Sequence, residues 1–149
     1  YLESISDDKL LLYVFESVLQ LYICELNENI REMYSVSYTM PSTSHKIYAY
    51  ITEKIESVFK EYLPEYETKD FYELEIAIAG IMRGFIINPC NMYFTMDRKV
   101  NRFIKTTLKI YEVPKDKIDE VIKKIEQFKM NDYAKEVIST LYEYISIRT

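Results

Sequence analysis

The side chains that could perform catalysis or bind a metal are few in this sequence and lie far apart along it. The single histidine, His45, follows three hydroxyl residues and has no second histidine or cysteine nearby, so zinc binding and acid–base catalysis lack the partners they need. The cysteines Cys24 and Cys90 have neither C-x-x-C spacing nor a neighbouring base that would generate a thiolate. We therefore predict a capping or surface role for His45, buried packing for Cys24 and a loop position for Cys90.

Other catalytic patterns are missing or have a simpler structural explanation. Glu73 and Glu75 could form a general acid–base pair, but they lie near the start of a predicted helix, where negative charge interacts favourably with the helix dipole. A phosphate-binding loop needs several glycines in one turn, whereas this chain has only Gly80 and Gly84, both within a predicted helix. We expect a protein that is not an enzyme and that has no catalytic residue, no metal and no cofactor.

Both glycines lie in the stretch ELEIAIAGIMRGFIINPC, residues 73–90. Glycine inside a helix costs about 1 kcal/mol relative to alanine, so the pair requires a packing reason. Ala77, Gly80 and Gly84 share one strip of the helix, which would let another helix approach closely, either within the chain or between subunits. Arg83 lies beside this strip, and a structural ion pair is favoured there over contact with a ligand.

A second set of candidates consists of tyrosine and methionine side chains with one phenylalanine, which could line an adaptable apolar cavity. Tyrosine carries a hydroxyl that can orient a ligand, and methionine repacks readily around one. Ordinary core packing is the alternative explanation. The set comprises Met33, Tyr34, Tyr38, Met40, Tyr48, Tyr50, Met82, Phe85, Met92, Tyr93 and Met96.

The elements that would position these residues are helices. Apolar residues recur at intervals of three and four along most of the chain, and only residues 35–39, SVSYT, come near a strand pattern. The predicted helices cover residues 7–33 with a break near Asn27, 42–62, 70–88 with Thr68 or Asp70 as its cap, 97–111 with Thr95 or Asp97 at its start, 115–129 and 133–147. We expect one all-α domain over residues 1–149, a bundle of about six helices with the apolar third helix at its centre.

Composition limits the classes of partner. The chain has 149 residues and a formal charge of −5, with cations and acids interleaved, so we do not expect it to bind DNA by itself. The apolar run at residues 76–87 is too short to span a membrane and contains a charge, and no signal peptide opens the chain. A soluble cytoplasmic protein is expected. Because the sequence begins with Tyr1, we also expect it to start inside a longer gene product.

Three segments together resemble the C-terminal regulatory region of TetR-family transcriptional repressors. They are YSVSYTMPSTSHKIYAYI at 34–51, FYELEIAIAGIMRGFIINPC at 71–90 and YFTMDRKVNRFI at 93–104. The likeness extends over residues 7–111 and concerns architecture more than motif. It implies a homodimer whose C-terminal domain encloses a pocket for a small apolar or aromatic effector. Operator DNA would be bound only through an N-terminal helix-turn-helix, which the sequence before Asp7 does not show.

The resemblance also implies where the dimer interface and the pocket lie. The helices at 70–88 and 97–111 would form the four-helix interface, and those at 115–129 and 133–147 are the alternative pair. Interface candidates are Ala77, Gly80, Gly84, Phe103 and Thr107. Pocket candidates among the first three helices are Met33, Tyr34, Tyr38, Tyr48, Met82, Arg83 and Phe85. The competing hypothesis is a helical protein-interaction module without a pocket.

Overall fold

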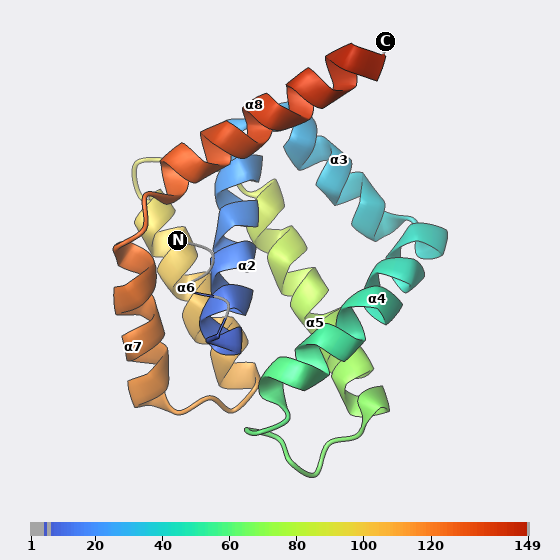
Figure 1. The fold of residues 1–149 in the computed structure, drawn as a ribbon, viewed down its shortest axis with the longest axis vertical. Coiled ribbons are helices and arrows are strands. Elements are labelled where there is room, and N and C mark those ends of the chain that lie inside the picture. The colour runs from blue at the N-terminus through green and yellow to red at the C-terminus, as the bar shows by residue number, and fades with distance from the viewer. Residues whose placement is uncertain (1–4, 6, 149) are drawn as a thin grey trace.

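The computed structural model describes residue 5 and residues 7–148, and these residues form seven α-helices and no β-strand (Figure 1). The all-α fold class is thereby confirmed. The helices are α2 (Lys9–Leu26), α3 (Glu28–Thr39), α4 (Pro41–Phe59), α5 (Thr68–Ile87), α6 (Met96–Ile110), α7 (Lys115–Glu126) and α8 (Met130–Arg148).

The helix predicted at residues 7–33 is two helices, because the break expected near Asn27 is complete. Asn27 has extended backbone angles, φ −138° and ψ 108°, and ends α2. Its side-chain oxygen accepts a hydrogen bond of 3.0 Å from the backbone N–H of Ile30, which caps α3. Residues 35–39, the nearest approach to a strand pattern, belong to α3. The described chain therefore has seven helices where six were predicted.

The remaining helix starts follow local capping chemistry. Asp70 accepts a 2.7 Å hydrogen bond from the backbone N–H of Glu67, and Glu67 is the N-cap of α5 in place of the predicted Thr68 or Asp70. The hydroxyl of Thr95 accepts from the backbone N–H of Arg98 at 3.4 Å and caps α6, so Thr95 is the cap of the two candidates, Thr95 and Asp97. Short local signals therefore determine these boundaries.

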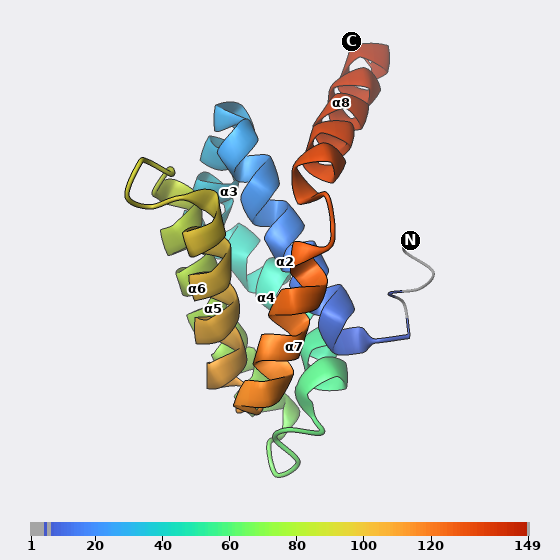
Figure 2. The same ribbon diagram turned by 90° about the vertical axis from the view of Figure 1, so that its left-hand side faces the viewer.

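The central helix is α2 rather than α5, which corrects the predicted arrangement. Helix α2 packs against each of the other six helices, whereas α5 packs against α2, α3, α4 and α6 only. Figures 1 and 2 show α2 running through the body, with α6 and α7 on one side of it and α4 and α5 toward the other. Apolar periodicity reports that a helix is largely buried, but it does not report which neighbours bury it.

Helix α8 crosses one end of α2 and then extends beyond the body of the protein (Figure 2). Only Met130 and Ala134, near its start, are buried. Its outer part exposes the large apolar side chains Val137, Leu141, Tyr142, Tyr144, Ile145 and Ile147. In the described part of the chain, no helix combines the length and apolar character that crossing a membrane requires.

Candidate functional site

Glu75 is the most unusual side chain in the interior. It lies on α5 and is 5% exposed, and within the described residues its carboxyl group forms neither an ion pair nor a hydrogen bond. Burial disfavours the charged form and raises the pKa of this carboxyl to about 7. Glu75 therefore changes its charge near neutral pH, with no cation to stabilise the ionised form.

Three tyrosines from three different parts of the fold lie near enough to this carboxyl group for its charge to raise their pKa. Tyr13 lies on α2, Tyr38 on α3 and Tyr111 directly after α6. Burial and then the nearby Glu75 charge raise the pKa of Tyr38 to about 12. Burial, followed by nearby acidic groups that include Glu75, also raises the pKa of Tyr13 and of Tyr111. We call these four residues, Tyr13, Tyr38, Glu75 and Tyr111, the Glu75 cluster.

Aromatic rings form one wall of the cluster. The ring of Phe59 stacks on Tyr111 with centroids 3.7 Å apart and meets Tyr13 edge-on at 5.0 Å. The Tyr111 hydroxyl is buried and forms no hydrogen bond of normal geometry, although it lies close enough to Tyr13 to affect its pKa. The hydroxyl of Thr107, one turn earlier, is also buried and has no hydrogen-bond partner among residue 5 and residues 7–148. Such groups cost free energy unless something satisfies them.

Four of the seven predicted pocket residues lie in the cluster, near its member Tyr38, or on the same face of α5 as Glu75. Tyr38 is a member, and its pKa also responds to Tyr34 and Tyr48, so the structure brings these three tyrosines together. Met82 is buried on α5 two turns after Glu75, on the same face of the helix. That these residues line a pocket stays a prediction, and the sequence did not single out the charged centre, Glu75.

Glu75 itself was assigned to a favourable position at a helix start, and this explanation is incomplete. The sequence signal that could have identified Glu75 as buried is its spacing from the apolar residues of the same helix. Phe71, Ile78, Ala79 and Met82 lie three, four or seven positions away and are all buried, so Glu75 falls on the apolar face. An acid on a buried stripe is a candidate functional residue.

The other three predicted pocket residues lie elsewhere. Met33 is 56% exposed. Arg83 is half-buried and donates a 3.5 Å hydrogen bond from Nε to the carbonyl of Ser35, and it forms no ion pair with any described residue, contrary to the favoured interpretation. Phe85 packs edge-on against Phe103 with centroids 6.0 Å apart. The interaction of Arg83 with α3 is structural, but its acceptor is a backbone carbonyl.

The predicted interface residues divide into two groups. Ala77 and Gly80 are exposed and Gly84 is half-buried. A Cβ atom added at either glycine would meet no other atom within 4 Å, so the strip faces open space and not another described helix. Phe103 and Thr107 are each 1% exposed and pack inside the chain, which leaves no surface on them for a second copy to contact.

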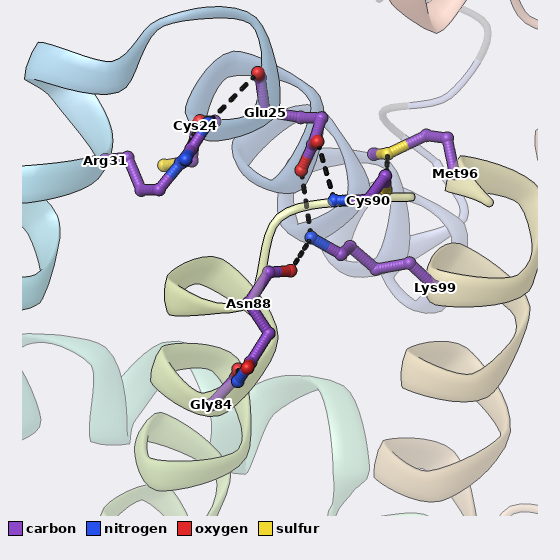
Figure 3. A network of polar contacts seen from close by, with 8 residues as sticks. All are labelled: Cys24, Glu25, Arg31, Gly84, Asn88, Cys90, Met96 and Lys99. Atoms are coloured by element: carbon purple, nitrogen blue, oxygen red, sulfur yellow. Dashed lines mark hydrogen bonds and ion pairs between the residues drawn. The ribbon is translucent and has the colours of Figure 1, made fainter. Parts of the chain in front are cut away.

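A polar network joins the α2–α3 junction to the loop between α5 and α6 (Figure 3). Lys99, 1% exposed, donates hydrogen bonds to Glu25 Oε2 at 2.9 Å and to the carbonyl of Asn88 at 2.6 Å. The backbone N–H of Cys90 donates to Glu25 Oε1 at 2.9 Å, and Arg31 Nε donates to the carbonyl of Cys24 at 3.0 Å. We call this the Glu25–Lys99 network.

Electrostatics in this network favour a structural role. Burial alone would raise the pKa of Glu25, but the hydrogen bonds from Lys99 and Cys90 outweigh burial and hold it below its usual range. Burial raises the pKa of Cys24 to about 11 and also raises that of Cys90, where Lys99 partly offsets it. Both thiols therefore stay protonated at neutral pH and are poor nucleophiles.

The remaining sequence-based candidates for chemistry occupy the positions expected of them. His45 is exposed in the first turn of α4, with Nδ1 3.2 Å from the Tyr72 hydroxyl, so its predicted surface position is confirmed. Cys24 is buried and Cys90 lies in a loop, also as predicted. Across residue 5 and residues 7–148, no group of three or more potential metal ligands comes together.

Comparison with known proteins adds no relative from which a role could be transferred. No protein-family model, no curated protein and no solved structure matches this chain. The TetR-like resemblance therefore rests on the sequence segments alone. A function for this protein has to be argued from its own geometry.

Proposed function

We propose that this chain is the effector-sensing and dimerisation domain of a TetR-like transcriptional regulator. The observation that carries the proposal is the Glu75 cluster, where a buried carboxyl group has tyrosines but no cation or hydrogen-bond donor of normal geometry beside it. Burying an ionisable group in this way is unfavourable, so it is retained most readily where it serves binding. A small apolar or aromatic effector with one polar group would contact the rings and hydrogen-bond to Glu75.

The same helices offer a route from the site to a change of shape. Helices α3 and α5 pack against each other, with Tyr38 on α3 and Glu75 on α5, while the Glu25–Lys99 network joins the α2–α3 junction to the loop after α5. An effector that separates Tyr38 from Glu75 would therefore displace the C-terminal part of α3 relative to α5, while the Glu25–Lys99 network holds the N-terminal end of α3 in place. Differential affinity of the effector for two such arrangements is what regulation requires.

The exposed strip of α5 supports the dimer part of the proposal. Ile76 is 43% exposed and Ile87 is 41% exposed, and they lie at either end of Ala77, Gly80 and Gly84. A smooth apolar strip permits close approach of a second helix, and a two-fold axis would place the same strip of a second copy against it. DNA would be contacted by a helix-turn-helix domain in the intact regulator, since this chain carries net negative charge.

Effector binding is tested by screening aromatic fragments with saturation-transfer NMR and measuring hits by calorimetry. Binding should weaken at least about tenfold in Glu75→Gln, because this variant loses the charge-assisted hydrogen bond to the effector. The control is Glu73→Gln, whose side chain is exposed on the same helix, and it should leave the affinity unchanged. The proposed site would be contradicted if fragments bound Glu75→Gln with unchanged affinity and perturbed NMR signals of residues elsewhere in the chain. Light scattering that finds only monomer at millimolar concentration would contradict the dimer.

The second candidate function is a helical protein-interaction module without an effector pocket. The outer part of α8 favours it, because five apolar side chains there exceed 40% exposure, namely Val137, Tyr142, Tyr144, Ile145 and Ile147. The two functions differ in what Glu75→Gln changes. An interaction module would keep its partner affinity in that variant and lose it when α8 is shortened.

A further inference from the structure

A groove of about 840 Å³ lies between α6 and α7, on a part of the surface that the proposed function does not use. Its walls carry the cations Arg102, Lys105 and Lys109 from α6 and Lys115 from α7. Its apolar part is formed by Ile110, Val113 and Ile118. The groove therefore combines an apolar floor with a cationic rim on both sides.

The charge of this groove is opposite to that of the protein. Four cations and one acid, Asp119, line it, which gives 4 − 1 = +3, while the whole chain carries −5. The single acid is already paired, because Lys115 Nζ lies 3.0 Å from Asp119 Oδ2. Arg102 and Lys109 form no ion pair with any described residue. Such a local reversal of sign favours an anionic ligand.

The spacing of the cations sets the size of that ligand. Arg102, Lys105 and Lys109 fall on successive turns of α6, so the first and last are about 10 Å apart along the helix axis. The side chains of Val113 and Ile118 are 5% and 7% exposed, so the floor between them and α6 is closed and apolar. One anionic group held by two cations, with a short apolar body on the floor, fits this arrangement.

A nucleic-acid backbone fits it less well. Duplex binding requires a broad cationic surface that neutralises many phosphates, and the net charge of −5 would repel the rest of the strand. An apolar floor also contributes nothing to contact with a phosphate backbone. The groove therefore favours a compact ligand over a polymer.

We propose that the α6–α7 groove binds a soluble anionic amphiphile, a small organic molecule with a carboxylate or phosphate group and an apolar body. The anionic group lies between Lys105 and Lys109, with Lys115 facing it from α7. None of the lining residues belongs to the Glu75 cluster, so binding to this groove can be tested independently of the proposed effector site.

The test uses octyl phosphate below its micellar concentration as the probe. Its binding is measured from the changes in the amide NMR chemical shifts of the whole chain. Shifts should concentrate at the amides of α6 and α7 around the groove, and binding should weaken as salt is raised because the rim is exposed. Octylammonium and 1-octanol, which match the apolar body but lack the anion, should bind at least about tenfold more weakly. Inorganic phosphate, which lacks the apolar body, should also bind more weakly.

Matched variants separate recognition by the groove from nonspecific attraction. Lys105→Gln combined with Lys109→Gln should weaken octyl phosphate binding roughly tenfold, because the two cations that hold the anionic group are removed. The control pairs Lys46→Gln with Lys135→Gln, which removes the same charge at exposed positions outside the groove and should change nothing. Equal losses in both variants, equal binding of 1-octanol, or attachment only to anionic lipid vesicles would overturn the proposal.

Discussion

Replacing Glu75 by Gln should make the protein more stable at high pH while changing little at low pH. The pKa of this carboxyl is about 7 in the folded protein against an ordinary value of 4.5. Below pH 4.5 the group is protonated in both states and contributes no difference. As pH rises from there through 7, the unfolded chain loses its proton first, so the folded state becomes progressively less stable.

The magnitude follows from the displacement of the pKa. One pKa unit corresponds to about 1.4 kcal/mol, so a displacement from 4.5 to about 7 corresponds to roughly 3 kcal/mol, fully developed above about pH 8. Glutamine cannot ionise and does not carry this cost. The free energy of unfolding of Glu75→Gln should therefore exceed that of the unchanged protein by roughly 3 kcal/mol more at pH 8.5 than at pH 4.5.

Urea denaturation at a series of pH values between 4.5 and 8.5 measures this difference. Glu73→Gln is the matched control, because it removes an acid two positions away on the exposed side of the same helix. Its stability difference from the unchanged protein should stay constant within about 0.5 kcal/mol. If the Glu75→Gln difference were also independent of pH, Glu75 would be ionised in a stabilised form, and the reasoning about an unpaired carboxyl would be wrong.

Other substitutions test the remaining features of the fold. Glu25→Gln leaves the buried Lys99 ammonium without its counter-charge and should lower the unfolding free energy by about 3 kcal/mol in urea. Asp119→Asn at an exposed pair should lower it much less, and similar losses in the two variants would show that burial does not distinguish the pairs. Gly80→Ala should stabilise by up to about 1 kcal/mol, since its Cβ meets open space, while Gly80→Leu should shift light scattering toward monomer with unchanged circular dichroism. A dimer unaffected by leucine would place the interface elsewhere. Asn27→Ala should cost about 1 kcal/mol in thermal unfolding through loss of the α3 cap, and no change would mean that the cap is redundant.

The helical content of this protein could be predicted because its signals are local. Apolar residues at intervals of three and four, Thr95 before α6 and the prolines between helices all act over a few positions. The break at Asn27 was indicated for the same reason, since its side chain competes for backbone N–H groups of the following turn. Predicting a complete break required knowing that α3 turns away to pack on α5.

The candidate site could be predicted only in part. Tyrosine and methionine were predicted as pocket formers by type; Tyr34 and Tyr48 lie near Tyr38, which lies near Glu75, and Met82 is buried on the same face of α5 as Glu75. Met33 has the same chemical character but is exposed, because residue type does not report which face of α3 is covered. The glycine strip was predicted to be a contact surface, and only the structure showed that no described helix of the chain fills it.

By itself, the sequence determined the all-α class, most of the helix boundaries and the absence of a motif for catalysis, because these depend on neighbours along the chain. The tertiary structure alone decided that α2 is central, that Glu75 is enclosed and that Lys99 pairs with Glu25 from 74 positions away. The reason is physical. Burial, and with it the cost or value of a charge, depends on residues distant in sequence that folding brings within a few ångströms.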